Sequence, residues 1–233
     1  MKLARFEQKP EIFYSIQGEG KNSGQPSVFV RFSSCNLHCV WCDTQYTWNW
    51  KKFSKKDEVI DCSVKEVAEI IVKLRCKNVV LTGGEPLLQQ KELVELMALL
   101  KPKGFWFEVE TNATILPSRE FDYYVDQYNC SPKLKNSGNS VKERIVEEAL
   151  EFFASSPKTF FKFVVQAAAD AEEAGELVAR FKIAKEKVCL MPEGKNAKEI
   201  KEKGPAVSKI CKVEGFHFSN RLHLELFGDR RGT

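Results

Sequence analysis

The chain has 233 residues, of which 43% are hydrophobic and 29% are charged, as in an ordinary globular protein. Its formal net charge of +4 suits an anionic small ligand or an acidic partner protein and is too small to predict nucleic-acid binding. The opening segment MKLARFEQKPEIFYS lacks the apolar core of a secretory signal, and no run reaches the roughly 18 apolar residues of a membrane span, so we expect a cytoplasmic protein without membrane association.

Strands and helices alternate along the first half of the chain. Ser63 and Glu66 form a capping-box pair, and apolar residues after them recur on one helical face. These patterns predict strands over 27–32, 78–82 and 105–111, and helices over 63–76 and 89–101. The stretch 117–140 is predicted to be irregular, with a short strand at the YYVD sequence, 123–126.

The second half repeats this alternation. Strands are predicted over 159–166 and 187–191, with helices over 141–154 and 170–182. A broadly helical segment follows over 196–211, with a break predicted at Gly204-Pro205 because proline disrupts a helix interior. Residues 216–226 are predicted to be a final extended segment.

Six or seven strands separated by single helices imply parallel pairing with right-handed crossovers. This is fewer than the eight strands of a closed (β/α) barrel. The predicted fold class is therefore α/β, an incomplete βα barrel with about six parallel strands. No linker, low-complexity tract or solenoid repeat interrupts the chain, which predicts a single domain over 1–233.

The unusual segments follow predicted strands. Three cysteines follow the strand at 27–32, and the sequences GGEP, TNAT, NCSPK and PEG each follow a later strand. Ligands of such folds bind outside the carboxyl ends of the strands. This arrangement predicts one functional site built from these loops.

The cysteines Cys35, Cys39 and Cys42 have the spacing C-x3-C-x2-C. In a cytoplasmic protein cysteines stay reduced, and clustered thiolates are soft ligands for iron–sulfur clusters, zinc or copper. Three thiolates leave one iron of a cubane cluster without a protein ligand, and that open position can hold a reactive molecule. The alternative is a zinc knuckle that lacks its fourth ligand or takes His38.

The other five cysteines are scattered along the chain: Cys62, Cys76, Cys130, Cys189 and Cys211. Cys189 lies in an apolar predicted strand and is most simply a small buried hydrophobe.

The cysteine loop, with Trp41 directly before Cys42, resembles the cluster loop of radical S-adenosylmethionine (SAM) enzymes. In that superfamily the three cysteines hold a 4Fe–4S cluster, and its open iron binds the amino and carboxylate groups of SAM. The reduced cluster cleaves SAM to a 5′-deoxyadenosyl radical. The resemblance implies that SAM itself occupies the fourth ligand position.

Residues 14–48 closely resemble the N-terminal region of the 7-carboxy-7-deazaguanine synthases, as do LTGGEPLLQ, VETNAT, CSPK, LMPEG and LHLELFGDRRGT in the same order. This resemblance implies conversion of 6-carboxy-5,6,7,8-tetrahydropterin to 7-carboxy-7-deazaguanine with loss of ammonia. The reaction is a radical ring contraction on the route to queuosine and archaeosine. The resemblance also implies bound Mg²⁺, a homodimer, and an electron donor such as flavodoxin or ferredoxin.

The same resemblance assigns roles to individual residues. The cluster ligands are Cys35, Cys39 and Cys42, and Thr44 matches the Mg²⁺ position. The implied SAM contacts are Trp41, Asp43, Gly84, Glu110, Ser131, Pro132, Lys133, Met191, Pro192, Glu193 and Gly194. The implied substrate contacts are Ile16, Gln17, Gly18, Glu19, Arg31 and Thr82.

Physical arguments bear on several of these positions. An arginine inside an apolar strand needs an anionic partner, and the pterin carboxylate fits Arg31 through two parallel hydrogen bonds. Strand alternation places Arg31 and Phe29 on one side, which favours a solvent-facing arginine, so the binding role of Arg31 rests on the resemblance. Gly18 allows close approach of a ligand. Ala113 stands where the family commonly has glycine. His223 could reach the pterin, but a lone histidine in a strand is more often structural, and no role is assigned to it.

Two other classes of protein are alternatives to this interpretation of the sequence. The first is another radical SAM enzyme, such as a glycyl-radical activase, which would act on a protein. The second is a non-enzymatic iron–sulfur carrier or zinc-binding interaction module, although a carrier normally supplies four cysteines per cluster.

Overall fold

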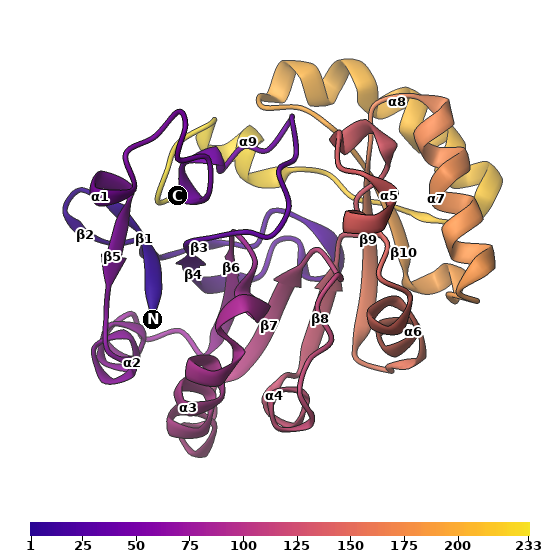
Figure 1. Cartoon of the computed structure of the whole chain (residues 1–233). Coiled ribbons are helices and arrows are strands. Elements are labelled where there is room, and N and C mark those ends of the chain that lie inside the picture. The colour runs from indigo at the N-terminus through magenta and orange to yellow at the C-terminus, as the bar shows by residue number, and fades with distance from the viewer.

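The computed structural model describes residues 1–233 and contains an open, curved sheet of eleven strands (Figure 1). Seven of the strands pair in parallel, in the spatial order β4-β6-β7-β8-β9-β10-β11. They are β4 (Pro26–Phe32), β6 (Asn78–Gly83), β7 (Trp106–Thr111), β8 (Gln127–Cys130), β9 (Thr159–Val165), β10 (Val188–Pro192) and β11 (His217–Phe218). The predicted incomplete barrel is confirmed.

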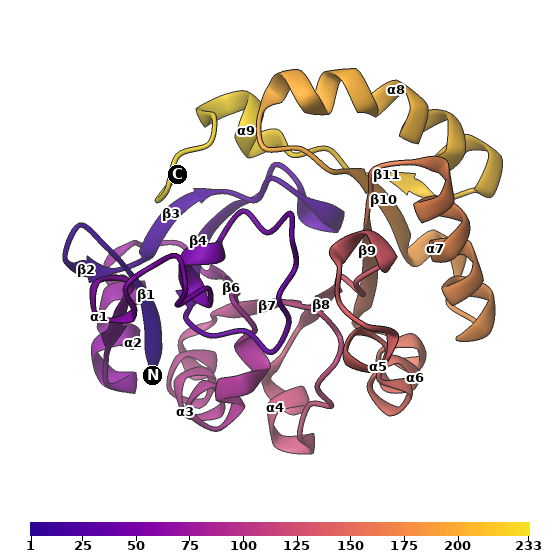
Figure 2. The ribbon, with the colours of Figure 1, turned by 45° about the horizontal axis from the view of Figure 1, so that its top comes forward.

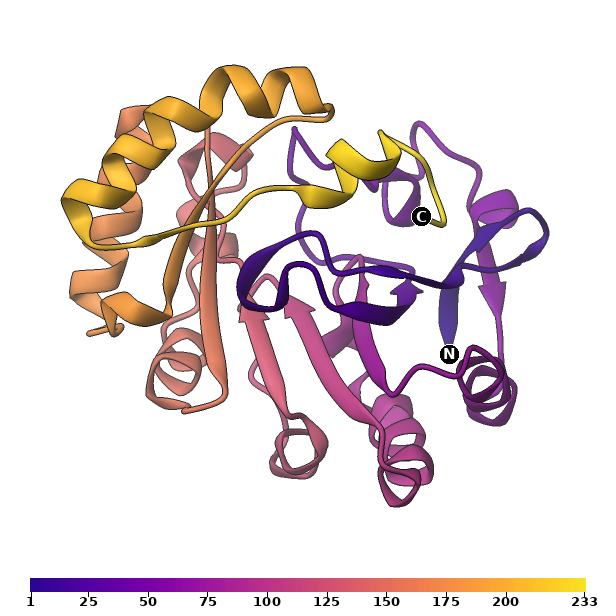
Figure 3. The same ribbon diagram turned by 180° about the vertical axis from the view of Figure 1, so that it is seen from behind.

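Four further strands extend the sheet beyond β4 with antiparallel pairing, which the sequence reading did not predict. They are β1 (Lys2–Phe6), β2 (Lys9–Pro10), β3 (Ile12–Ile16) and β5 (Val59–Asp61). β3 lies along β4, with Ile12 opposite Val30 and Ile16 opposite Pro26. This pairing carries the chain after Ile16 across the inner side of the curved sheet (Figure 3).

Most of the helices cover the outer side of the sheet, whereas α9 (Leu222–Phe227) lies on the cavity side near β3 (Figure 2). The other helices are α1 (Lys55–Glu58), α2 (Val64–Lys73), α3 (Gln90–Leu100), α4 (Arg119–Tyr124), α5 (Val141–Arg144), α6 (Glu147–Ser155), α7 (Ala168–Arg180) and α8 (Ala197–Glu214). α2 begins at the predicted capping box, where the Ser63 hydroxyl accepts from the Glu66 amide. None of the helices combines the length and apolarity needed to cross a bilayer.

The central strands are apolar on their outer face and polar on their inner face. On β7, Phe107 and Val109 are buried in the hydrophobic core, whereas Glu108 alternates with them and accepts hydrogen bonds inside the barrel. On β8, Tyr128 lies in the core and Asn129 donates to Glu108. The alternation therefore gives the barrel a polar interior enclosed by an apolar layer.

Residues 123–126 do not form the predicted strand. Tyr123 and Tyr124 end α4, which begins at Ser118, whose hydroxyl accepts from the amide of Phe121. The strand is β8, directly after this segment. The predicted helix over 141–154 is divided into α5 and α6.

The predicted break at Gly204-Pro205 is also wrong, because α8 continues through Pro205 (Figure 2). Its buried residues Ile200, Gly204, Val207 and Cys211 form one stripe that runs past the proline. Burial of that stripe offsets the cost of an interior proline, about 3 kcal/mol. The segment 216–226 is extended only at β11 and continues into helix α9.

Gly84 lies where the loop after β6 crosses the cysteine loop after β4. A Cβ at this position would lie 1.9 Å from the carbonyl oxygen of Ser34 and 3.1 Å from the amide nitrogen of Cys35. The Gly84 amide donates to the Phe32 carbonyl at 2.9 Å, and the Glu85 amide donates to the Ser34 carbonyl at 2.8 Å. Because Gly84 has no side chain, the cysteine loop can lie this close to the loop after β6.

We expect Gly84→Ala to displace the cysteine loop and lower the free energy of unfolding by about 1–3 kcal/mol, as overpacking does. Thermal unfolding followed by circular dichroism measures this loss, and iron and sulfide content after anaerobic reconstitution should fall with it. The matched control is Gly175→Ala within α7, where a Cβ meets nothing within 4 Å. That substitution should leave Tm unchanged or raise it. Equal Tm values for Gly84→Ala and the unsubstituted chain would contradict this account.

Candidate active site

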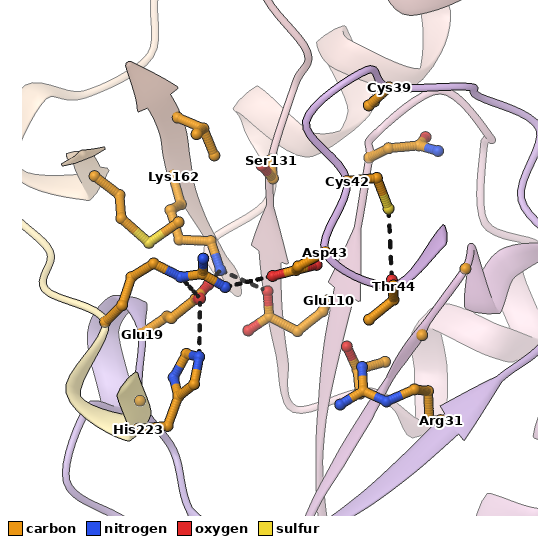
Figure 4. Close-up of a pocket in the computed structure, with 18 of the residues that line it drawn as sticks. Glu19, Arg31, Cys39, Cys42, Asp43, Thr44, Glu110, Ser131, Lys162 and His223 are labelled. Carbon is orange, nitrogen blue, oxygen red and sulfur yellow. Dashed lines mark hydrogen bonds and ion pairs between the residues drawn. The ribbon is translucent and has the colours of Figure 1, made fainter. Parts of the chain in front are cut away.

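A cavity of about 260 Å³ opens at the carboxyl ends of the parallel strands (Figure 4). Every residue with a predicted cluster, Mg²⁺, SAM or substrate role lines it, except Pro132. The lining also includes His223, Asn112 and residues for which the sequence suggested no role, among them Phe13, Phe29, Lys162 and Arg221. The loops that the sequence pattern placed together therefore share one pocket.

Hydrogen-bond donors point at each sulfur of the cysteine loop. The Leu37 amide donates to Cys35 Sγ at 3.4 Å, Asn139 Nδ2 to Cys39 Sγ at 3.2 Å, and Trp48 Nε1 to Cys42 Sγ at 3.4 Å. Such donors stabilise thiolate ligands and tune the metal that they hold. Burial raises the pKa of the Cys35 thiol to about 12, with the Glu85 carboxylate adding to the effect, so a metal is needed to displace its proton.

The donor set fits a cubane cluster better than a zinc ion. No three His, Cys, Asp or Glu side chains converge closely enough to hold one metal ion. In a cubane cluster each thiolate binds a different iron, so the ligands share a pocket without meeting at one point. His38, the alternative fourth zinc ligand, packs its ring against Trp48 at 4.9 Å between centroids and does not line the cavity.

Five charged side chains of alternating sign form a chain along the cavity wall (Figure 4). Lys162 Nζ lies 2.6 Å from Glu19 Oε2 and 2.9 Å from Glu110 Oε2. Arg221 Nε lies 2.8 Å from Glu19 Oε1, and its Nη2 lies 2.5 Å from Asp43 Oδ2. We call this set, Asp43, Arg221, Glu19, Lys162 and Glu110, the charge chain.

The ion pairs of the charge chain favour the ionised forms of Glu19 and Lys162 although burial disfavours them. Burial alone would raise the pKa of Glu19, but Lys162 and Arg221 lower it well below its ordinary value. Burial alone would lower the pKa of Lys162, but Glu110 and Glu19 raise it above its ordinary value. Burial lowers the pKa of the neighbouring His223, which favours the neutral imidazole. The cavity wall therefore carries fixed charges of both signs.

The amide of Gln17 is anchored inside the barrel. Its Nε2 donates to Glu108 Oε1 at 2.5 Å, and Asn129 Nδ2 donates to the same oxygen at 2.5 Å. Asn22 Nδ2 donates to Glu108 Oε2 at 2.6 Å. Burial and the nearby Glu110 carboxylate raise the pKa of Glu108. These bonds fix the loop after β3 against β7 and β8.

Gly18 makes room for the side chain of His223, whereas the sequence suggested that it makes room for a ligand. A Cβ at Gly18 would lie 2.0 Å from His223 Nδ1, so the glycine makes room for the C-terminal segment. The Leu222 amide donates to the Gly18 carbonyl at 2.9 Å. His223 therefore reaches the cavity from the start of α9, and not from the extended segment predicted there.

Arg31 is not a solvent-facing arginine. Its side chain is 18% exposed, and its Nε lies 2.7 Å from Glu11 Oε1. Glu11 Oε2 also accepts from Arg231 Nη2 at 2.8 Å, so one buried carboxylate serves two arginines. Arg31 lies opposite Thr82 on the neighbouring strand, and both line the cavity.

The remaining predicted SAM residues lie on three neighbouring segments: the cysteine loop, the loop after β8, and the end of β10 with the loop that follows it. Lys133 Nζ lies 2.9 Å from Ser131 Oγ and 5.3 Å from the centre of the Trp41 ring. The Gly194 carbonyl accepts from Arg221 Nη1 at 2.5 Å, and Glu193 pairs with Lys203 at 2.6 Å. The loop after β10 is thus tied to the charge chain through Arg221.

Glu85, the glutamate of GGEP, joins two of these loops although no role was predicted for it. Its buried carboxylate accepts from the Thr111 hydroxyl at 2.9 Å and the Asn112 amide at 2.8 Å. The next residue, Ala113, has φ +61, in the left-handed region that favours glycine. Ala113 therefore adopts a backbone conformation that residues with a side chain rarely take, and its methyl group is buried.

Sequence reasoning missed Lys162 and Arg221, which complete the charge chain. Lys162 is a lone lysine in the apolar sequence TFFKFVV, the same signal that drew attention to Arg31. Arg221 lies outside regular structure, directly before α9, and its sequence context carries no comparable signal.

Comparisons with known proteins agree with this geometry. Residues 29–133 match the radical SAM superfamily. A 7-carboxy-7-deazaguanine synthase from Pyrobaculum aerophilum is 40% identical over 227 residues, covering 95% of each chain. One from Halobacterium salinarum is 35% identical over 244 residues, covering 96% of this chain and 91% of the relative.

A solved structure shares the fold over most of its length. QueE from Escherichia coli superposes with a TM-score of 0.69 and 26% identity, covering 91% of this chain and 92% of that chain. Together with the sequence relatives and the pocket described above, this likeness shows that the chain belongs to the 7-carboxy-7-deazaguanine synthase family of the radical SAM superfamily.

Proposed function

We propose that this chain converts 6-carboxy-5,6,7,8-tetrahydropterin to 7-carboxy-7-deazaguanine, with contraction of the ring and loss of ammonia. One observation carries the proposal: the cysteine loop, the loop after β3 and the loops after β6, β7, β8 and β10 all open into the same cavity. The 4Fe–4S cluster and SAM, when bound there, supply abstraction of a hydrogen atom from the substrate. The product would serve 7-deazapurine synthesis, on the route to queuosine or archaeosine.

The residues of the chain bind and orient the two ligands. Cys35, Cys39 and Cys42 would hold the cluster. Glu110 of β7 and the loops carrying Gly84, Ser131 and Gly194 would hold SAM beside it. Gln17 and Glu19 would face the polar edge of the pterin, whose donors and acceptors match an amide and a carboxylate. Arg31 would bind the pterin carboxylate, with Thr82 next to it on β6.

Thr44 would provide the protein's hydroxyl ligand to Mg²⁺. Its Oγ1 lies 3.6 Å from Cys42 Sγ and lines the cavity, so an ion there would sit between the cluster side and the substrate side. Magnesium takes few protein ligands and retains waters or substrate oxygens. The pterin carboxylate would complete its coordination.

The proposed setting is a reducing cytoplasm, since all eight cysteines are free thiols. An acidic flavodoxin or ferredoxin would supply electrons, and we expect a homodimer by analogy with the family. We treat the 233 residues as one domain, because 39 buried residues form a single hydrophobic cluster across the sheet and its helices.

An anaerobic assay tests the function directly. We expect the reconstituted protein, given reductant, SAM, Mg²⁺ and the carboxytetrahydropterin, to form 7-carboxy-7-deazaguanine detectable by mass. Chelation of Mg²⁺ should lower the rate. An intact cluster that cleaves SAM without forming the deazaguanine would refute the proposed substrate and leave the superfamily in place.

The cluster ligands can be tested one by one. Cys35→Ala, Cys39→Ala and Cys42→Ala should each abolish the iron–sulfur absorbance and the activity, because each removes the sole protein ligand to one iron. Cys62→Ala is the matched control, as its half-buried thiol lies outside the cavity, and it should keep both. Retention of a SAM-responsive cluster in any of the three variants would refute the assignment.

Arg31→Gln should raise the KM for the pterin by about 10–100-fold, as expected for loss of a charge-assisted hydrogen-bond pair of 1.5–3 kcal/mol. The Kd for SAM should change little. Arg31→Lys retains the charge without the planar fork and should give an intermediate KM. An unchanged KM in Arg31→Gln would show that the carboxylate binds elsewhere.

A further inference from the structure

Lys162 is a buried ammonium to which the proposed chemistry gives no role. Its side chain is only 7% exposed and projects from β9 into the cavity (Figure 4). It lies 2.6 Å from Glu19 Oε2 and 2.9 Å from Glu110 Oε2. Glu19 belongs to the loop proposed to bind the pterin, and Glu110 ends the strand proposed to bind SAM. Lys162 therefore contacts one carboxylate from each ligand site.

The two carboxylates depend on Lys162 to different extents. Glu110 forms no other ion pair, and its Oε1 accepts only the Gln17 and Asn129 amides. Glu19 forms a second ion pair, with Arg221. Loss of the ammonium would thus leave Glu110 without a counter-charge, whereas Glu19 would stay attached to the C-terminal segment. The protein should still fold, with its loop after β3 held less tightly.

We propose that Lys162 is a positioning residue that couples the two ligand sites of this enzyme. Its ammonium holds Glu19 and Glu110 in one relative arrangement, so a ligand that restrains either carboxylate also restrains the other. SAM bound beside Glu110 would then order the loop 17–22, and a pterin bound at that loop would order Glu110. Such coupling must be reciprocal, because each ligand removes motion that the other would otherwise have to remove.

The coupling of SAM to the pterin rests on the proposed function, because the pterin is the proposed substrate. The first test of the coupling needs only SAM. Hydrogen–deuterium exchange is measured on anaerobically reconstituted protein with and without SAM, in peptides covering residues 14–24. In the unsubstituted chain SAM should slow amide exchange across 17–22. In Lys162→Met that SAM-dependent slowing should be strongly reduced, because only the long Gln17–Glu110 hydrogen bond of 3.3 Å then joins the loop to Glu110, and Lys162→Arg should restore most of it.

Lys158→Met is the matched control. Lys158 directly precedes β9, and its ammonium donates to the Asp122 carbonyl at 2.6 Å, outside the cavity. In the Lys158→Met variant, SAM should slow amide exchange across 17–22 as it does in the unsubstituted chain. If Lys162→Met fails to fold, Glu110→Gln tests the same link, since it removes the ion pair and retains the shape of the side chain. Undiminished protection of 17–22 in the folded variant, or no protection in the unsubstituted chain, would overturn the proposal.

A second measurement adds the pterin. Saturating carboxytetrahydropterin should tighten SAM binding by about fivefold or more in the unsubstituted protein, the usual lower range of such coupling. This tightening should become clearly smaller in Lys162→Met. Unchanged tightening would overturn the coupling, whereas a pterin that does not bind the unsubstituted protein would refute the proposed substrate and leave the SAM-only result to stand.

Discussion

Two cations hold one half-buried carboxylate, and most of the site depends on that arrangement. Glu19 pairs with Lys162, 143 residues away in sequence, and with Arg221, 202 residues away. A buried charge without partners costs several kcal/mol, so the segments that supply these partners must meet at this point. Through Asp43 and Glu110 the same pairing reaches the cysteine loop and β7. The binding surface is therefore assembled by electrostatics from distant parts of the chain.

The curved sheet makes this assembly possible because its two faces have opposite character. Outward side chains such as Phe107, Tyr128 and Phe161 pack beneath the helices and supply the apolar burial that stabilises the fold. Inward side chains of the same strands are polar, and Glu108 collects three amide donors. A barrel interior that is neither filled with apolar groups nor closed by an eighth strand leaves room for ligands beside these fixed polar groups.

Local pattern was sufficient to predict five of the seven parallel strands and the loops that follow them. The site residues were assigned through the family resemblance, and all but Pro132 line the cavity. Local pattern failed where tertiary contacts decide the outcome. β8 was misplaced because Gln127 and Asn129 face a polar interior and lack the apolar signal of a core strand. Pro205 does not end α8, since the buried stripe of that helix continues past it. The pairing of Lys162 with Glu19 and Glu110 joins three separate segments, which no local window contains.

The charged side chains that line the cavity balance in sign, as the carboxylates Glu19, Asp43, Glu110 and Glu193 are matched by the cations Arg31, Lys133, Lys162 and Arg221. The formal excess of +4 must then reside on the rest of the molecule. Dissolved salt screens exposed charges strongly and buried pairs weakly. Ionic strength should therefore affect two kinds of recognition differently: SAM, with its sulfonium, ammonium and carboxylate, would meet a cavity of balanced charge on which salt acts weakly, whereas the attraction of the outer surface for any acidic partner would fade as salt is added.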